Sequence, residues 1–284
     1  MNRSHPSKII LFGEYAVIKG ADALIMPFHS YCGHLEITGL EVDESLWKFY
    51  ESLNDSRILK AQMDLDKFEK DVKKGMRFIS TIPQGMGLGS SGALCSAVFD
   101  KYAFKKDVEL SLLKEYFSIM ESHFHGKSSG IDPLVSFMDK CLYTDKDHNV
   151  AIVDRPKLSE LGAFYLLNSN IQRHTAPLVH SFLKDFSSPT LDEELKKYIK
   201  LSNNCIQNVF DCEKKNFSLN INEISKFQLK YFKNMIPKNL LKFWDDGLNC
   251  GDYALKLCGA GGGGFFICYS HSENLNYKNL TLIS

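Results

Sequence analysis

A glycine-rich stretch, IPQGMGLGSSGA at residues 82–93, is the strongest indication of chemistry in this sequence. Its alternating glycines leave backbone N–H groups open to a polyanion, and the start of the expected helix adds a positive dipole end. Ser90 and Ser91 add hydroxyls that can cap the helix, bind phosphate or hold a Mg²⁺ ion between phosphates. The stretch matches neither a Walker A nor a GxGxxG dinucleotide sequence. We predict a phosphate-binding loop, with a plain glycine-rich helix start as the alternative.

Two charged residues near the beginning of the chain, Lys8 and Glu14, interrupt an apolar run at residues 8–18. The run is rich in Ile, Leu, Phe and Val, which is typical of a strand with one well-buried face. A charged side chain in such an element costs desolvation free energy unless it has a partner. We therefore expect each of these residues at a strand end or in a site.

A pair of carboxylates, Glu121 and Asp132, delimits the segment ESHFHGKSSGID, which lies at the end of a predicted helix. Taken singly, Glu121 could be a solvated helix-end charge, and Asp132 could cap a helix that begins at Pro133. Two histidines in the segment, His123 and His125, are two residues apart and so point to different sides of a helix. We therefore expect no transition-metal site here, and His125 is expected to support the turn.

A second glycine run, KLCGAGGGG at residues 256–264, precedes the strand-like FFICY. This run, the phosphate loop and the N-terminal PSKIILFGEYAVIKG form three motifs whose order resembles the GHMP kinase superfamily, named for galactokinase, homoserine kinase, mevalonate kinase and phosphomevalonate kinase. The segment from Glu121 to Asp132 is similar to the mevalonate kinase pattern, a glutamate followed by His-Gly-x-Pro-Ser-Gly-x-Asp at the same spacing. The resemblance covers nearly the whole chain.

The resemblance implies a two-domain α+β fold. An N-terminal domain like ribosomal protein S5 domain 2 is expected at residues 1–156 and a ferredoxin-like domain at residues 157–284, with ATP and substrate between them. The implied reaction is ATP-dependent, Mg²⁺-assisted phosphorylation of the 5-hydroxyl of (R)-mevalonate or of a similar alcohol.

The same resemblance implies roles for individual residues. Lys8 and Asp132 are expected to be catalytic, at the acceptor hydroxyl, whereas Ser91 and Glu121 are expected to bind Mg²⁺. ATP contacts are expected from the phosphate loop: Pro83, Gly85, Gly87, Leu88, Gly89, Ser90, Ser91, Gly92 and Ala93. Substrate contacts are expected from more distant parts of the chain: Glu14, Arg173, Thr175, Gly261 and Gly262.

Some of these expectations have alternatives. Arg173 offers a planar donor fork for a carboxylate or phosphate, but an exposed arginine beside a loop cap is an equal interpretation. Tyr15, Ser128 and Cys258 depart from the family pattern, which has His, Pro and Thr or Ser at these positions. Another GHMP kinase, acting on a sugar, homoserine or phosphomevalonate, remains open. So do diphosphomevalonate decarboxylase and a non-catalytic nucleotide-binding relative.

Composition excludes several other classes. The formal net charge is zero, which argues against a general binder of nucleic acid or anionic membranes. No long apolar run suggests a membrane span, and residues 1–8 are too short and polar to be a signal peptide. We therefore expect a cytoplasmic protein with no membrane partner, and a homodimer is left open. The eight cysteines form no CxxC pair and are expected to be reduced and mostly buried.

The elements that must position these residues follow from hydrophobic periodicity. Aromatic residues in the C-terminal half, including Phe232 and Trp244, are expected in the core. One or two strands are expected at residues 23–38, and single strands at residues 77–82, 162–170, 265–269 and 280–283. Helices are expected at residues 88–104, 108–124, 191–209, 220–235 and 239–253.

Overall fold

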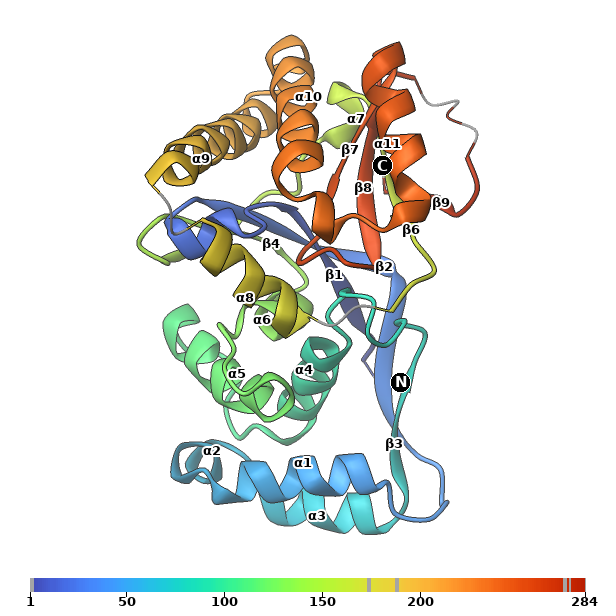
Figure 1. Cartoon of the computed structure of the whole chain (residues 1–284). Coiled ribbons are helices and arrows are strands. Elements are labelled where there is room, and N and C mark those ends of the chain that lie inside the picture. The colour runs from blue at the N-terminus through green and yellow to red at the C-terminus, as the bar shows by residue number, and fades with distance from the viewer. Residues whose placement is uncertain (1–2, 173–174, 187–188, 273–274, 276, 284) are drawn as a thin grey trace. The chain divides into compact units, whose positions relative to one another are not determined.

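The computed structural model describes residues 3–172, 175–186, 189–272, 275 and 277–283 (Figure 1). Its mixture of helices and sheets confirms the expected α+β class. The chain forms two compact units that interleave along the sequence. Unit 1 comprises residues 1–8, 27–83 and 88–140, and unit 2 comprises residues 9–26, 84–87 and 141–284. The sequential division into residues 1–156 and 157–284 stays a prediction about family domains.

The first sheet has five strands in the order β1-β2-β4-β5, with β3 also paired to β2. β2 is antiparallel to β3 and to β4, which is antiparallel to β5. β2 is one continuous strand of 15 residues, where the sequence left one or two strands open. The bounds are β1 His5–Phe12, β2 Ala23–Ile37, β3 Met76–Ser80, β4 Cys141–Thr144 and β5 Val150–Val153.

The helices of unit 1 bury their apolar faces on one another. α1 packs beside α3 (Figure 1), and α4 packs against both α5 and α6. The rings of Phe99, Phe117 and Phe137 contact one another where α4, α5 and α6 meet. The bounds are α1 Glu44–Asp55, α2 Arg57–Gln62, α3 Leu65–Lys73, α4 Ser90–Tyr102, α5 Leu110–His125 and α6 Ile131–Met138.

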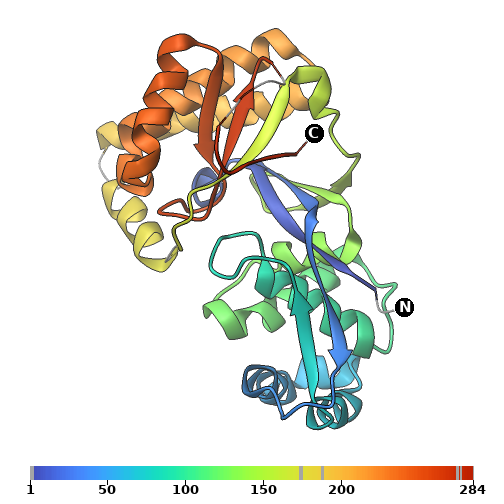
Figure 2. The same ribbon diagram turned by 90° about the vertical axis from the view of Figure 1, so that its right-hand side faces the viewer.

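Unit 2 contains the second sheet, in the order β7-β8-β6-β9, and its helices. α10 and α11 lie against β7, as Figure 2 shows for the orange helices beside the orange and red strands. Phe232 and Trp244 are fully buried, as expected. The bounds are α7 Leu158–Leu161, β6 Ala163–Asn168, α8 Thr175–Asp185, α9 Pro189–Phe210, α10 Lys214–Tyr231, α11 Lys238–Cys250, β7 Tyr253–Leu257, β8 Phe265–Ser270 and β9 Leu280–Leu282.

The N-terminal strand is shorter than the apolar run at residues 8–18 predicted. β1 ends at Phe12, and Gly13 follows with a φ of 108°. A Cβ at Gly13 would lie 2.4 Å from the Cβ of Ala23. Only glycine fits at this position, and it allows the chain to turn here. The run then continues as a 3₁₀ turn, η1 (Ala16–Lys19), instead of a strand.

The thiols agree with the prediction. All eight cysteines are free, and most of them are buried. Among the described residues, no helix combines the length and the apolar composition needed to cross a membrane.

Candidate active site

A buried ion pair lies at the centre of the predicted site. Lys8 Nζ is 2.9 Å from Asp132 Oδ2, and the lysine side chain is only 4% exposed whereas that of Asp132 is 30% exposed. Lys8 lies in the middle of β1, so the partner required by its desolvation cost is Asp132. The two residues predicted to be catalytic are therefore in direct contact, and one of them is open to solvent.

A tight turn determines where Asp132 lies. Gly130 precedes α6 with a φ of 74°, and a Cβ there would lie 2.2 Å from the backbone oxygen of Lys114 in α5. α6 begins at Ile131, so Asp132 lies in its first helical turn and is not the cap of a helix starting at Pro133. A carboxylate in the first turn interacts favourably with the helix dipole.

The phosphate loop contacts the same ion pair. The backbone N–H of Lys8 donates to the backbone oxygen of Leu88 at 2.9 Å. Gly89, with a φ of 75°, is the N-cap of α4, and a Cβ there would lie 2.9 Å from Lys8 Cγ and 3.6 Å from Asp132 Oδ2. The missing side chain thus leaves room for the ion pair. Ser90 and Ser91 are the first two residues of α4, so neither is its N-cap.

The predicted metal ligands also lie together. Ser91 Oγ donates to Glu121 Oε1 at 3.3 Å and is 2.9 Å from His125 Nε2. Glu121 is 3% exposed, which contradicts a solvated helix-end charge. Ser128 Oγ makes a short hydrogen bond to the other oxygen of Glu121. Each carboxylate oxygen of Glu121 therefore accepts a hydrogen bond from a serine hydroxyl.

Burial dominates the electrostatics of Glu121. Desolvation and the nearby charge of Asp132 raise the pKa of Glu121 to about 7, against smaller opposing effects of the Ser128 hydrogen bond and the Lys8 charge. A carboxylate whose charge is costly in isolation favours a nearby cation.

The donor set suits Mg²⁺ bound together with phosphates. Glu121 and Ser91 offer hard oxygen donors, but no cluster of three or more His, Cys, Asp or Glu able to hold a metal exists in the described part of the chain. Mg²⁺ commonly takes one or two protein ligands and completes its shell with water and substrate phosphates. The residues therefore fit Mg²⁺ carried by a nucleotide better than a protein-only metal site.

The remaining phosphate-loop glycines, Gly85 and Gly87, belong to unit 2 and have positive φ. A Cβ at Gly85 would meet only side-chain atoms of Gln172, at 3.9 Å. In contrast, a Cβ at Gly92 in α4 would lie 2.8 Å from the backbone nitrogen of Pro133. Gly92 is thus explained by the crossing of α4 and α6, whereas a Cβ at Gly85 would make only ordinary van der Waals contacts.

The second glycine run packs against protein backbone. A Cβ at Gly261 would lie 2.6 Å from the backbone oxygen of Met235, and one at Gly262 would lie 2.5 Å from Leu178 Cδ1. The backbone N–H of Gly262 donates to that Met235 oxygen at 2.6 Å. Close packing inside unit 2 therefore accounts for these glycines, and their predicted substrate contact stays a prediction.

Glu14 is buried in unit 2 and forms an ion pair with Lys256 on β7. Both side chains are 1% exposed, and Lys256 Nζ also donates to the backbone oxygen of Leu257 at 2.7 Å. The neighbouring Tyr15 donates its hydroxyl to the backbone oxygen of Ala260 at 2.5 Å. Glu14 and Tyr15 thus tie the N-terminal turn to the second glycine run, and a substrate role for Glu14 stays a prediction.

The predicted substrate anchor is only partly visible. Arg173 lies outside the described residues, and Thr175 is the first residue of α8. Their roles stay predictions.

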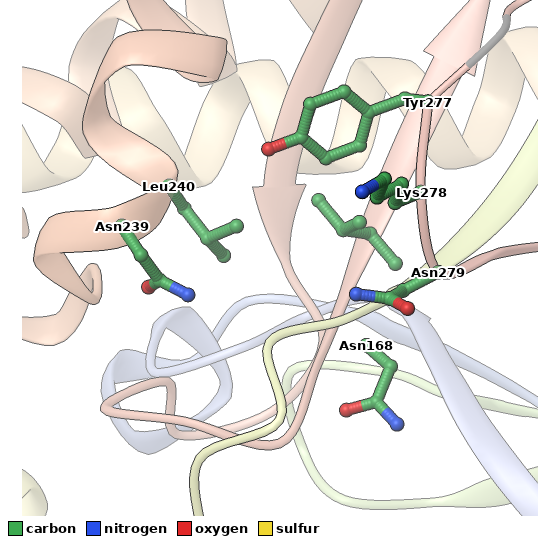
Figure 3. Close-up of a pocket in the computed structure, with 7 residues that line it drawn as sticks. Asn168, Asn239, Leu240, Tyr277, Lys278 and Asn279 are labelled. Carbon is green, nitrogen blue, oxygen red and sulfur yellow. The ribbon is translucent and has the colours of Figure 1, made fainter.

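A pocket of ≈ 520 Å³ in unit 2 contains none of the predicted residues (Figure 3). Asn239 Nδ2 donates to the backbone oxygen of Ser169 at 3.3 Å, and Asn168 Oδ1 accepts from the backbone N–H of Asn170 at 2.8 Å. The first bond joins α11 to the residue after β6, and the second closes the turn at the end of β6, so both asparagines have a structural use. The lining residues are Leu167, Asn168, Asn239, Leu240, Tyr277, Lys278 and Asn279.

Sequence reasoning missed three contacts. Lys256 is a charged residue in an apolar run, so the signal that identifies Lys8 as a residue with a partner also applies to Lys256. The prediction that His125 supports the turn does not include its contact with Ser91, whose Oγ lies 2.9 Å from His125 Nε2. Ser128 was noted only as a departure from proline, and no sequence signal shows that its hydroxyl reaches Glu121.

A family model matches part of this chain. The model of the GHMP kinases N terminal domain matches residues 55–140 of this chain. The matched range contains the phosphate loop, Glu121 and Asp132.

Individual relatives agree with this match. The chain is 28% identical to the mevalonate kinase of Pyrococcus abyssi, over 92% of this chain and 86% of that protein. Its structure is similar to L. major mevalonate kinase in complex with R-mevalonate, with a TM-score of 0.68 and 15% identity over 96% of this chain and 88% of that chain. It is also similar to Lactococcus lactis galactokinase complexed with galactose, with a TM-score of 0.67 and 14% identity over 95% of this chain and 85% of that chain.

Proposed function

This chain belongs to the GHMP kinase superfamily, and from that premise we propose that it transfers a phosphoryl group from ATP to the 5-hydroxyl of (R)-mevalonate. The observation that carries the proposal is the contact of Lys8 with Asp132 beside Gly89 at the start of α4. A carboxylate that can accept a proton, a cation and a helix start with a glycine N-cap then lie together in unit 1. Phosphoryl transfer relies mainly on such positioning and charge neutralisation.

In this proposal Asp132 orients the acceptor hydroxyl and takes its proton as the oxygen attacks. Lys8 holds the carboxylate at 2.9 Å, and its positive charge favours the negative charge that develops beside it. The partial exposure of Asp132 supports access by an alcohol, whereas the buried lysine is held by β1.

ATP and Mg²⁺ fit the residues at the start of α4. Ser91 and Glu121 would hold the metal, and the loop from Pro83 to Ala93 would hold the phosphates through its backbone N–H groups. The chemistry supplied by the bound nucleotide and metal is a transferable phosphoryl group whose charge is partly neutralised.

The acceptor is the finer part of the proposal. The folds of a mevalonate kinase and a galactokinase match this chain almost equally well, with TM-scores of 0.68 and 0.67, so the fold does not choose between their acceptors. Mevalonate is supported by the sequence likeness to the Pyrococcus abyssi mevalonate kinase and by the spacing from Glu121 to Asp132. Arg173 and Thr175 are proposed to anchor its carboxylate.

A panel of acceptor alcohols tests this function. The purified protein is assayed for Mg²⁺-dependent consumption of ATP with (R)-mevalonate, phosphomevalonate, galactose and homoserine. We expect turnover with (R)-mevalonate and little with the others. Preference for another alcohol would replace the acceptor and leave a kinase. Absence of turnover with every alcohol, together with intact binding of ATP, would favour a non-catalytic relative.

A further inference from the structure

Three serines around the end of α5 form a hydrogen-bonded group, and we propose that they hold Glu121 in the orientation in which it binds the metal. This serine latch comprises Ser118, Ser122 and Ser128. The inference deepens the proposed function and rests on it, because it assumes that Glu121 binds Mg²⁺ carried by ATP. In the latch, Ser128 is a positioning residue that acts through Glu121.

The hydrogen-bond direction of the Ser128 hydroxyl follows from its neighbours. The backbone N–H of Gly130 lies 3.1 Å from Ser128 Oγ and can only donate, so the serine oxygen accepts there. The single hydroxyl proton is then left for Glu121 Oε2, with which Ser128 makes its short bond. A carboxylate only accepts, so the directions agree.

The backbone of Ser128 is held on the side of α5. Its N–H donates to Ser122 Oγ at 3.2 Å, and its carbonyl oxygen accepts from Ser118 Oγ at 2.7 Å. The hydroxyl of Ser122 in turn donates to the backbone oxygen of Ser118 at 2.6 Å. Ser118 and Ser122 lie four residues apart and therefore on one face of the helix, where together they bind both polar backbone groups of residue 128.

The latch distinguishes the two oxygens of Glu121. Oε2 is held by Ser128, whereas Oε1 faces Ser91, the other proposed ligand. Fixing one oxygen prevents rotation of the carboxylate and keeps the other beside the Ser91 hydroxyl. Proline, the residue of the family pattern at position 128, has neither the N–H bound to Ser122 nor the hydroxyl bound to Glu121. This chain therefore holds its carboxylate by a contact that the pattern residue cannot make.

Metal–nucleotide binding without any acceptor alcohol tests the latch. The affinity of each purified protein for Mn²⁺·ATP, and for ATP in excess EDTA, is measured by calorimetry, since Mn²⁺ accepts the same oxygen ligands as Mg²⁺. Ser128→Ala removes the hydroxyl, and Ser128→Thr keeps it. Ser129→Ala is the matched control, because the neighbouring Ser129 is exposed and its Oγ contacts the backbone N–H of Ile131 at 3.4 Å.

We expect Ser128→Ala to weaken Mn²⁺·ATP binding about tenfold, the lower end of what loss of a contact behind a metal ligand typically costs. Binding of ATP in EDTA should not change, and Ser128→Thr and Ser129→Ala should bind like the wild type. Should Ser128→Ala fold poorly, Ser122→Ala provides a second test, because it removes the acceptor of the Ser128 N–H and should also weaken metal-dependent binding.

Three results would overturn the latch. Wild-type affinity of Ser128→Ala for Mn²⁺·ATP would show that the hydroxyl does not position Glu121, and the kinase proposal would stand. Equal losses for Ser128→Ala and Ser129→Ala would assign the effect to loop stability. A wild type that gains no affinity for ATP from Mn²⁺ would overturn both the latch and the role of Glu121, whereas lack of turnover with mevalonate affects only the acceptor.

Discussion

At the scale of single residues, the site consists of charges that are buried with their partners. Lys8 is buried in a strand and Glu121 in a helix, and each would cost several kcal/mol as an isolated buried ion. Lys8 gains Asp132, and Glu121 gains two serine hydroxyls. Glu121 nevertheless keeps a pKa raised to about 7, so its charge is not fully compensated in the protein alone.

Asp132→Asn keeps the shape of the side chain and removes its negative charge. We expect the turnover number to fall at least about a hundredfold, as is typical for loss of a positioned acid–base group, with the affinity for ATP little changed. Steady-state kinetics with saturating ATP measures the first and calorimetry the second. Turnover close to that of the wild type would remove Asp132 from the mechanism.

Glu121→Gln separates metal binding from stability. Because the folded pKa of Glu121 is raised above its unfolded value, its contribution to stability is present below pH 4.5 and is lost as the pH rises through about 7. The ligand-free variant should therefore melt no lower than the wild type at pH 8. The Mg²⁺ concentration for half-maximal activity should rise about tenfold or more, as expected for a weakened metal site. Unaltered Mg²⁺ dependence would contradict a role in metal binding.

At the scale of elements, glycines allow strands, turns and helices to approach the site closely. Gly130 brings the turn before α6 against α5, and Gly92 lets α4 cross α6. Gly89 leaves room for the Lys8 side chain. In each case a Cβ would meet an atom of a neighbouring element at 3.0 Å or less, which is closer than real contacts allow.

Gly89→Ala tests this close approach, with Gly20→Ala as the matched control. Both glycines have left-handed backbone, with φ of 75° and 83°, so both changes should cost roughly 1–2 kcal/mol of stability. A Cβ at Gly20 meets nothing within 4 Å, whereas one at Gly89 meets Lys8. We expect similar melting temperatures for the two variants but a large loss of turnover for Gly89→Ala alone. Equal turnover would mean that Lys8 is not displaced.

His5 on β1 provides a pH prediction. Its side chain is buried, with Nδ1 2.7 Å from Ser96 Oγ, and burial lowers the pKa of His5 to about 4 although Asp100 acts in the opposite direction. Between pH 6.5 and 4 the unfolded chain therefore binds a proton that the folded protein does not. The free energy of unfolding should therefore decrease as the pH is lowered from 6.5 to 4, by at most about 3 kcal/mol.

Thermal melts of the wild type and of His5→Gln from pH 7 to 4 measure this effect. The glutamine variant lacks the titrating group, so it should lose less stability over the window than the wild type. Parallel pH dependence of the two proteins would show that folding does not lower the pKa of His5.

At the scale of the whole molecule, the fold is shared more widely than the acceptor. The TM-scores of 0.68 and 0.67, at 15% and 14% identity, show that this chain shares its fold with both a mevalonate kinase and a galactokinase. The shared fold therefore identifies no acceptor, and in the proposed function the side chains of the site select the alcohol.

Ligand binding should appear as a stability change of the whole chain. A ligand that binds only the folded protein stabilises it by about 2.7 kcal/mol at a hundredfold excess over its Kd. We expect Mg²⁺·ATP to raise the melting temperature more than ATP in EDTA does, and Glu121→Gln to lose the Mg²⁺-dependent part of the increase. Asp132→Asn should keep the full increase. A melting temperature that does not respond to Mg²⁺·ATP would contradict nucleotide binding.

The amino-acid sequence was enough to indicate a likeness to the GHMP kinases, to predict the α+β class and most helices and strands, and to single out Lys8, Ser91, Glu121 and Asp132 as candidate site residues. Local signals suffice for these, because hydrophobic periodicity reflects which face is buried and a charge in an apolar run indicates a partner. The apolar run does not reveal that β1 ends at Phe12. Glycine is required at position 13 by the close approach of Ala23, and Ala23 lies outside the run.

The partner of each charged side chain depends on the tertiary structure. Lys8 meets Asp132 and Glu14 meets Lys256 across 124 and 242 residues of sequence, and no local pattern specifies such pairs. The same holds for Ser128, whose hydroxyl reaches Glu121 because the turn at Gly130 packs against α5. Burial and hydrogen-bond direction depend on atoms that folding brings together. The sequence therefore supplies suitable residue types, and the folded chain gives each of them a defined partner.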